Sequence, residues 1–172
     1  MKIDTKILIR KNAFISGATG GIGKEISLAL AEQGCNLFLT SSTDSELQKV
    51  VELCEKYNIK VESYSGDLSQ IDDVYKIIEH VKSSLGKIDI LINSAGIFPN
   101  TNLFEINDEL YLETLNVNFR SAFLFTREFS KGMVKQKWGR IVNIGSSSAY
   151  SGFGGTSMYC ASKHALLGFS RA

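Results

Sequence analysis

The chain has 172 residues and a mass of 18.9 kDa, which fits one folded domain with a substantial hydrophobic core and leaves little room for two. Its apolar fraction of 44% and charged fraction of 22% are close to globular averages, which excludes disordered, collagen-like and coiled-coil chains. A net charge of +1 gives no general attraction for nucleic acid or an anionic membrane, and no apolar run reaches the roughly 20 residues that a membrane span needs.

The first half of the chain alternates short apolar runs with longer amphipathic segments. A strand is expected at 13–15, followed by a helix at 21–33 that ends at Gly34, a typical residue after a helix C-terminus. A second strand at 36–40 precedes a second helix at 45–57.

The pattern continues with a third strand at 60–65. Ser69 and Asp72 have the spacing of a capping box, which opens a third helix. The apolar residues of that helix recur at helical spacing and predict one buried face, formed by Ile71, Val74, Tyr75, Ile78, Val81 and Leu85.

The second half adds strands at 88–93 and 140–144, a long helix over roughly 109–133, and a last helix that begins near Ser157. Short apolar strands that are each separated by a helix-length segment predict a parallel sheet covered on both faces. We therefore expect an α/β, doubly wound parallel sheet (a Rossmann fold) in one domain over residues 1–172. The last helix lacks a C-terminal glycine, a turn and a following strand, so we expect a C-terminally truncated version of this fold that exposes a strand edge.

The first strand runs into a glycine-rich turn over residues 16–23, directly before a helix. Gly17, Gly21 and Gly23 would permit a tight turn and let a pyrophosphate approach the backbone at the helix N-terminus. The spacing is GxxxGxG, and Ile26 stands where the common GxGxxG pattern has its third glycine. A glycine turn without a ligand is the alternative interpretation.

Hydroxyl side chains follow the second strand, where an NAD site would carry an acidic residue. Ser41, Ser42 and Thr43 stand there, and Asp44 comes a few residues too late. Without a carboxylate there is room for a 2′-phosphate, to which hydroxyls can donate. This favours NADP as the cofactor, with NAD possible because the same position carries no Arg or Lys.

Together with further motifs in the same order, this turn resembles the short-chain dehydrogenase/reductase family. Residues 93–96 (NSAG) resemble its NNAG element, and Asp67 with Leu68 matches the acidic site that contacts adenine. The catalytic tetrad of the family falls on Asn118, Ser146, Tyr159 and Lys163. The resemblance implies cofactor contacts from Gly17, Thr19, Gly21, Ile22, Gly23, Ser41, Ser42, Asp67, Leu68, Asn93, Ala95, Gly96, Tyr159 and Lys163.

These residues have a chemical rationale in the reduction of a carbonyl group or its reverse. Lys163 lies one helical turn beyond Tyr159, and its ammonium charge favours the phenolate form of the tyrosine. Tyr159 would exchange a proton with the reacting oxygen, and Ser146, 13 residues upstream, would donate a hydrogen bond to it. The resemblance implies that Asn118 holds a water molecule that relays protons to Lys163. Asn116, two residues earlier, should face away from this site.

The predicted function is therefore NAD(P)-dependent oxidoreduction of a small-molecule ketone or alcohol. Similarity to 3-oxoacyl-acyl-carrier-protein reductases suggests a 3-oxoacyl thioester, while sugar, polyol and steroid substrates stay open. A cofactor-binding regulator without catalysis is the alternative from another class. A methyltransferase would share the glycine turn but gives no reason for the Tyr159–Lys163 pair.

The remaining expectations concern metals, location and assembly. Cys35, Cys54 and Cys160 lack metal-ligand spacing, their odd number does not fit a disulfide framework, and we expect no metal. The first residues mix charged and apolar side chains, so no signal peptide is indicated and we expect a reducing, cytoplasmic location. Helix 109–133 is apolar on more than one side, which predicts a homo-oligomer, either a dimer or a tetramer.

Overall fold

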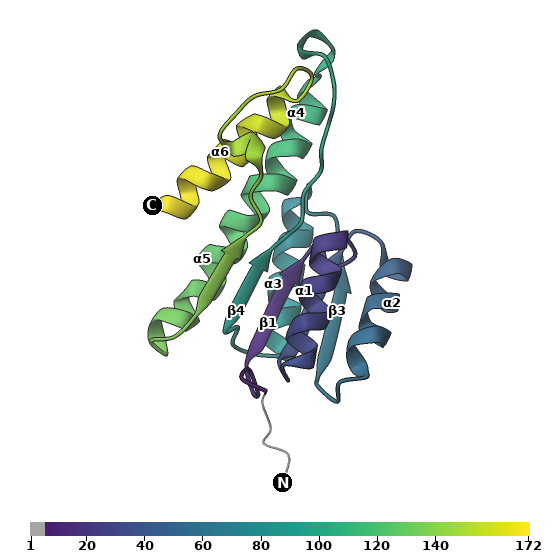
Figure 1. The fold of residues 1–172 in the computed structure, drawn as a ribbon, viewed down its shortest axis with the longest axis vertical. Coiled ribbons are helices and arrows are strands. Elements are labelled where there is room, and N and C mark those ends of the chain that lie inside the picture. Colours follow the sequence, from purple (N-terminus) through teal and green to yellow (C-terminus); the bar gives the residue numbers. More distant parts are fainter. Residues whose placement is uncertain (1–5) are drawn as a thin grey trace.

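The structure is a computed structural model that describes residues 6–172. Its centre is one parallel sheet of five strands in the order β3-β2-β1-β4-β5 (Figure 1). The first strand is central and the chain winds outward from it in both directions, so the predicted doubly wound topology is confirmed. The strands are β1 (Asn12–Ser16), β2 (Asn36–Ser41), β3 (Val61–Ser65), β4 (Ile90–Asn93) and β5 (Arg140–Asn143).

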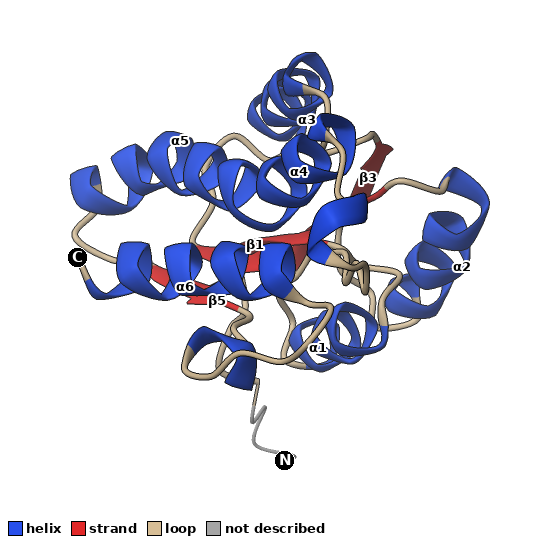
Figure 2. Ribbon diagram, turned by 90° about the horizontal axis from the view of Figure 1, so that it is seen from above, coloured by secondary structure: helices blue, strands red, loops and turns tan. Residues whose placement is uncertain are grey.

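Helices cover the sheet in layers. Figure 2 shows α1 (Gly21–Glu32) and α2 (Asp44–Glu55) on one side of it, and α3 (Ile71–Ser84), α4 (Asp108–Leu115) and α5 (Ser121–Lys135) on the other. The helix α6 (Ser157–Arg171) lies beside α4, beyond the carboxyl ends of the strands (Figure 1).

Two buried clusters, one on each face of the sheet, form the core. Phe14 of β1 packs with Phe125 and Phe129 of α5, at ring-centroid distances of 4.6 and 5.2 Å. On the opposite face, Ile15 belongs to a cluster with residues of β2 and α2. Because successive strand residues point to opposite faces, the continuous apolar runs of β1 and β2 fill both clusters at once.

The beginning of α3 differs from the sequence-based prediction. The helix starts at Ile71 with Gln70 as its N-cap residue and has no side-chain cap, so the predicted capping box is wrong. The backbone N–H of Ser69 donates instead to the Asp67 carboxylate, at 2.8 Å. Within the predicted buried face, Ile71 and Tyr75 are 44% and 40% exposed, because the core side of the helix is carried by Val74, Ile77, Ile78 and Val81.

The long helix predicted at 109–133 is interrupted. A π-helical segment, Asn116–Arg120, separates α4 from α5. Such segments insert one extra residue into a helical turn and are common at functional sites. The rings of Phe119 and Phe123 meet Phe169 of α6, with centroids 6.0 and 5.9 Å apart. Part of the second apolar side of this helix pair is therefore covered within the chain itself.

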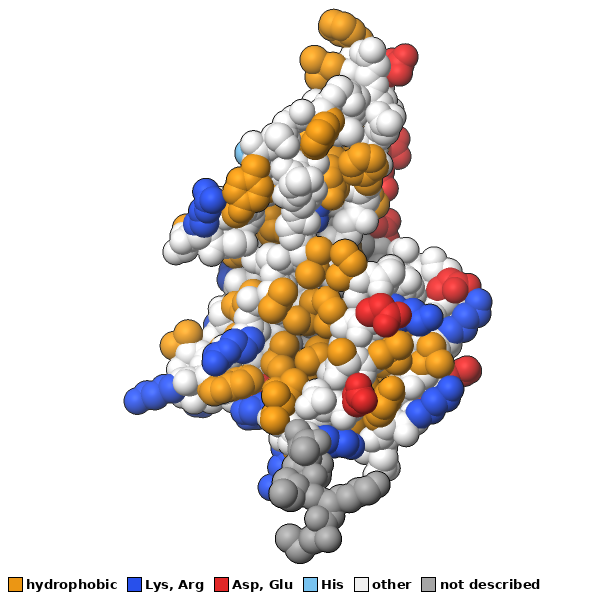
Figure 3. Space-filling view, viewed as in Figure 1, with side chains coloured by type: hydrophobic (Ala, Val, Ile, Leu, Met, Phe, Trp, Pro, Cys, Tyr) orange, Lys and Arg blue, Asp and Glu red, His pale blue; other side chains and the backbone are white. Residues whose placement is uncertain are grey.

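The sheet is not covered evenly. The strand β5 is an edge strand with only one neighbour, β4, and Ile141 and Val142 are 39% and 43% exposed. Hydrophobic side chains gather over the middle of the molecule in Figure 3, where Figure 1 shows no helix in front of β4 and β5. The prediction of an exposed strand edge is confirmed, while the expected cover on both faces is wrong at β5.

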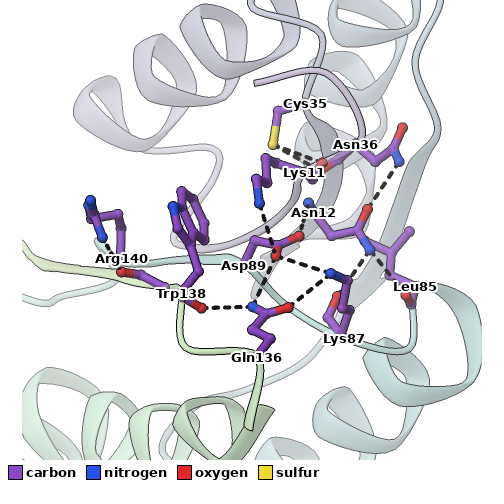
Figure 4. Close-up of polar contacts among 11 residues, drawn as sticks. Lys11, Asn12, Cys35, Asn36, Leu85, Lys87, Asp89, Gln136, Trp138 and Arg140 are labelled. Atoms are coloured by element: carbon purple, nitrogen blue, oxygen red, sulfur yellow. Dashed lines mark hydrogen bonds and ion pairs between the residues drawn. The ribbon is translucent and has the colours of Figure 1, made fainter. Parts of the chain in front are cut away.

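A polar network ties together the amino ends of the strands (Figure 4). The carboxylate of Asp89 is fully buried and accepts hydrogen bonds from the Asn12 backbone N–H at 2.9 Å and from the Gln136 amide at 3.0 Å. The ammonium groups of Lys87 and Lys11 lie 3.4 and 3.8 Å away. The network joins the beginnings of β1 and β4 to the chain that follows α5.

Candidate cofactor-binding and catalytic site

The turn between β1 and α1 is built around two close backbone approaches. Gly17 has a φ of +70°, and a Cβ atom there would lie 2.6 Å from the Cα of Ala95. A Cβ atom on Gly23 would collide with the carbonyl oxygen of Gly17. Only glycine fits at these two positions, and together they bring the N-terminus of α1 close to the loop after β4.

An open cavity of about 410 Å³ lies beside this turn, at the carboxyl ends of the strands. This is the edge at which open α/β sheets bind ligands. The cavity is contributed by the loops after β1, β2, β3 and β4 and by one face of α4 and the π-helical segment. Its lining residues are Gly17, Thr19, Gly20, Ser41, Ser42, Gly66, Asp67, Leu68, Ser94, Ala95, Gly96, Ile97, Glu113 and Val117.

Hydroxyl groups form the wall near the end of β2. The side chains of Thr19 and Ser41 share a hydrogen bond of 2.6 Å, and Ser41 is 7% exposed while Ser42 is exposed. The glycine turn is thereby attached to the strand end where the ribose 2′-position of a dinucleotide would lie.

Asp67 and Leu68 form the wall near the end of β3. The Asp67 carboxylate accepts the Ser69 N–H, and the Asp67 backbone N–H donates to the carboxylate of Asp73 at 3.1 Å. Hydrogen bonds donated by the Lys76 ammonium group and by the Asp67 backbone N–H hold the pKa of the Asp73 carboxyl below its usual value. These contacts fix the loop, and Leu68, which is 6% exposed, presents an apolar surface to the cavity.

Asn118 lies in the π-helical segment and connects three parts of the chain. Its Oδ1 accepts the Ile97 N–H at 2.8 Å, and its Nδ2 donates to the Ile97 carbonyl at 2.9 Å and to the Ser162 hydroxyl at 3.0 Å. Both amide hydrogens are thus used by protein partners, which leaves acceptor capacity on Oδ1 alone for a water molecule. Asn116 points elsewhere, as predicted, since its amide donates to the carbonyl of Ser69 at 3.2 Å.

Lys163 is buried in α6, with an exposure of 5%. Its ammonium group donates to the Ile144 carbonyl at 2.8 Å and lies 5.7 Å from the centre of the Tyr159 ring. A Cβ atom on Gly96 would be 3.7 Å from the Lys163 ammonium nitrogen, so the loop after β4 passes directly by it. Burial lowers the pKa of Lys163 from its ordinary value.

Tyr159 and Ser146 complete the predicted tetrad, and each has its own partners in the described part of the chain. The Tyr159 ring packs against the edge of Phe98, with centroids 4.6 Å apart. The Ser146 hydroxyl accepts the Ser148 N–H at 3.1 Å and lines a different, smaller cavity between β5 and α6. Among residues 6–172, no hydrogen bond joins the hydroxyls of Ser146 and Tyr159. Gly96 lies beside both Asn118 and Lys163, and Lys163 lies near the Tyr159 ring, so these three predicted residues gather around the loop after β4.

The predicted cofactor residues separate into two groups. Eight of them line the cavity: Gly17, Thr19, Ser41, Ser42, Asp67, Leu68, Ala95 and Gly96. The others act around it. Gly23 allows the close approach described above, Ile22 is 57% exposed on α1, and the Asn93 amide donates to the Asn143 side chain at 2.7 Å inside the sheet. Gly21, Tyr159 and Lys163 also lie outside the cavity lining.

Several lining residues were not predicted, among them Gly20, Gly66, Glu113 and Val117. Glu113 and Val117 are four residues apart, and this spacing puts their side chains on one face of the helix. Val117 directly precedes Asn118. That spacing was visible in the sequence, but nothing in it says that the face meets the loops after β1 and β3. The fit to a dinucleotide is good, because the backbone at Gly17 leaves no room for a side chain and hydroxyl groups line the 2′ end.

Two further observations concern other kinds of site. In the described part of the chain, no group of three or more His, Cys, Asp or Glu side chains could hold a metal ion. Over the same residues, none of the helices is both long enough and apolar enough to cross a membrane. The three cysteines are free and buried, and burial raises the pKa of Cys35 to about 12 and that of Cys54 to about 11.

Comparison with known proteins agrees with this geometry. The family model for short chain dehydrogenases matches residues 11–172, so the chain belongs to the short-chain dehydrogenase family. It is 37% identical over 161 residues to an L-rhamnose 1-dehydrogenase (NADP(+)) of Thermoplasma acidophilum, covering 92% of this chain and 63% of the relative. It is 33% identical over 162 residues to the 3-oxoacyl-[acyl-carrier-protein] reductase FabG of Pseudomonas aeruginosa, covering 94% and 66%.

Solved structures give the same result. A metagenomic short-chain oxidoreductase in complex with NADP superposes with a TM-score of 0.89 at 28% identity, covering 94% of this chain and 74% of that one. An NAD+-bound xylitol dehydrogenase superposes with a TM-score of 0.87 at 28% identity, covering 95% and 64%. The chain spans slightly less than two thirds of the length of the curated relatives described above.

Proposed function

We propose that this protein is an NADP-dependent oxidoreductase that interconverts a ketone and a secondary alcohol. The observation that carries the proposal is the placement of Tyr159, Lys163 and Asn118 around the loop that ends the dinucleotide cavity. The ammonium group of Lys163 is 5.7 Å from the Tyr159 ring, and Gly96 connects this cluster to the cavity wall. Homology to an NADP(+) dehydrogenase and to an NADP-bound structure supports the choice of cofactor.

Each residue of the site would have a distinct role in the reaction. The bound dinucleotide would supply or accept the hydride. Tyr159 would give its phenolic proton to the substrate oxygen in reduction and remove it in oxidation, and the nearby positive charge of Lys163 would favour the phenolate. The Gly17 turn would admit the pyrophosphate at the N-terminus of α1. Ser146 would donate a hydrogen bond to the reacting oxygen.

The cofactor preference rests on the hydroxyl wall of Thr19, Ser41 and Ser42. No carboxylate belongs to this wall, so nothing there repels a 2′-phosphate, and the hydroxyls can donate to it. NAD is the second candidate, since an NAD+-bound relative has the same fold.

Tyr159→Phe tests the proposal. The full-length protein is assayed by NADPH oxidation with a panel of ketones, and cofactor binding is measured by calorimetry. We expect the variant to lose about two to four orders of magnitude in kcat, the usual contribution of a positioned acid, with an unchanged Kd for NADP. A variant that keeps full activity contradicts the mechanism. A protein that binds NADP but reduces no ketone supports the alternative, a regulator without catalysis.

The substrate, the assembly and the location belong to the same proposal. A 3-oxoacyl thioester is the first candidate from the named FabG relative, and sugars and polyols are supported by the rhamnose and xylitol dehydrogenases. We expect a cytoplasmic location. We also expect a homo-oligomer, because Leu112 and Val134 keep apolar surface exposed on α4 and α5. Light scattering of the full-length protein at micromolar concentration checks this, and a monomer mass contradicts it.

A further inference from the structure

The surface around Tyr159 is aromatic. The Phe98 ring packs edge-on against Tyr159 with an interplanar angle of 79°, yet 60% of Phe98 remains exposed. Phe98 lies in the loop between β4 and α4, and Phe153, which is 58% exposed, lies in the loop between β5 and α6. The Thr101 N–H donates to the Gly155 carbonyl at 2.8 Å, so the two loops are joined next to the predicted proton donor.

Apart from Glu105, the same two loops carry no charge. Residues 94–104 and 141–162 contain no Asp, Glu, Lys, Arg or His, in a chain of which 22% is charged. In Figure 3 the upper part of the molecule carries mainly hydrophobic and uncharged side chains, with acidic groups along one edge and a basic group at the opposite edge. The Lys163 ammonium group lies 5.7 Å from the Tyr159 ring, but Lys163 is 5% exposed and donates to the Ile144 carbonyl.

This environment selects against charged substrates. A carboxylate or phosphate that is moved from water to an uncharged apolar surface loses hydration without gaining a partner. An apolar substituent gains from the same surface, because it covers exposed ring area, and aromatic pairs add a further attraction of their own.

From the Phe98–Tyr159 contact and the uncharged segments 94–104 and 141–162 beside it, we propose that Phe98 is a specificity-determining residue. It selects an uncharged ketone or secondary alcohol whose apolar substituent packs on the Phe98 ring while its oxygen meets Tyr159. The inference rests on the proposed function, since it takes Tyr159 as the proton-transfer group.

Three ketones test it with the full-length protein and NADPH. Acetophenone and 4-acetylbenzoate share a ring and a carbonyl and differ by one carboxylate, while acetone lacks the apolar substituent. We expect kcat/KM for acetophenone to exceed that for 4-acetylbenzoate at least tenfold. Phe98→Ala should lower kcat/KM for acetophenone about three- to tenfold, mostly through KM, and should leave acetone almost unchanged, with Phe98→Leu between the two.

Phe104→Ala is the matched control, because it removes the same ring from the same loop at a position that is 95% exposed. It should leave all three substrates unaffected. Equal kcat/KM for acetophenone and 4-acetylbenzoate overturns the inference, as does a Phe98→Ala protein with an unchanged ratio of acetophenone to acetone turnover.

A binding measurement separates this inference from the proposed function. Saturation-transfer NMR on the NADP complex of Tyr159→Phe detects bound acetophenone without turnover. Phe98-dependent binding in a protein that reduces no ketone would keep the inference and refute the oxidoreductase function. Turnover that does not depend on Phe98 would refute the inference and keep the oxidoreductase function. A protein that neither binds nor reduces these three ketones, yet reduces another ketone of the panel, overturns the inference and keeps the oxidoreductase function.

Discussion

At the scale of single residues, Lys163 is the least ordinary group in the site. Its ammonium group is buried, and one backbone carbonyl, that of Ile144, accepts a hydrogen bond from it. Burial lowers its pKa, which means that the folded protein holds the positive charge less readily than the unfolded chain does. This loss of stability accompanies the placement of a positive charge near Tyr159.

This leads to a prediction about stability and pH. Where the lysine is protonated in both the folded and the unfolded state, the penalty for the buried charge is fully present. As the pH rises through the lowered pKa toward the ordinary lysine value of 10.5, Lys163 loses its proton earlier in the folded state, so the unfolded state binds more protons and stability rises. We therefore expect the unfolding free energy of the protein that keeps Lys163 to increase relative to that of Lys163→Met between pH 7 and pH 10.

Urea titrations at each pH, followed by circular dichroism, measure this difference. Both proteins should carry Tyr159→Phe, so that the titration of the neighbouring phenol does not contribute. The prediction is contradicted if the difference in unfolding free energy between the two proteins does not change with pH, or if the protein with Lys163 becomes less stable relative to Lys163→Met as the pH rises.

At the scale of elements, the π-helical segment and α6 are joined by one hydroxyl group. Ser162 is fully buried, accepts from the Asn118 amide at 3.0 Å and donates to the Tyr159 carbonyl at 2.7 Å. The same Asn118 amide holds Ile97 in the loop after β4. Ser162 is thus the link between the helix of the predicted proton donor and the wall of the cavity.

Removing that hydroxyl should loosen the link. We expect Ser162→Ala to lower the free energy of unfolding by about 1–2 kcal/mol, the usual loss for one buried hydrogen-bonding group, and Ser162→Thr to keep most of the stability. Ser157→Ala, at an exposed position of the same helix, controls for a change in helix propensity. The idea fails if Ser162→Ala and Ser157→Ala have the same urea midpoint.

The elements also show how far sequence reasoning reaches. The apolar runs of β1, β2 and β4 predicted the strands and their parallel order, because burial on both faces leaves a continuous apolar signal. The interruption at Asn116–Arg120 could not be predicted, because apolar periodicity continues on both sides of it. What accompanies the interruption is a tertiary contact, between Asn118 and the backbone of Ile97, 21 residues earlier.

The candidate site divides in the same way. Gly17 and Gly23 were predictable, because a glycine-rich turn between a strand and a helix has few other uses. Glu113 was not, since its place in the cavity wall depends on how α4 sits against the sheet. The capping box failed for a local reason, namely that Asp67 already accepts the Ser69 N–H.

At the scale of the whole molecule, the two ends of the sheet differ in composition. The carboxyl ends carry glycines, hydroxyls and the cavity, while the amino ends carry the buried Asp89 carboxylate and its lysine and amide partners (Figure 4). The groups at the carboxyl ends suit ligand binding. The groups at the amino ends connect strands β1 and β4 to the chain after α5 through hydrogen bonds. Stability and binding should therefore respond to different substitutions.

Asp89→Asn tests this separation. We expect a loss of about 1–3 kcal/mol in unfolding free energy, because the buried backbone and amide donors lose a charged acceptor, while Lys87 and Lys11 can recover hydration through their exposed sides. The Kd for NADP, measured by calorimetry, should stay unchanged. Glu62→Gln, which breaks the exposed pair with Lys60, should cost less than about 1 kcal/mol. Weaker NADP binding by Asp89→Asn would show that the two ends are coupled.

The position of the single tryptophan has a practical consequence. The Trp138 ring lies 3.8 Å from the Lys11 ammonium nitrogen and 5.2 Å from the Arg140 guanidinium carbon, in the chain between α5 and β5, and the chain contains no second tryptophan. Intrinsic fluorescence therefore originates at the amino end of the sheet and reports the packing of residues around Asp89. A change in tryptophan emission when the oxidised cofactor is added, after correction for the absorbance of the cofactor, would show that binding alters the packing at the amino end, because Trp138 does not line the cavity beside Gly17.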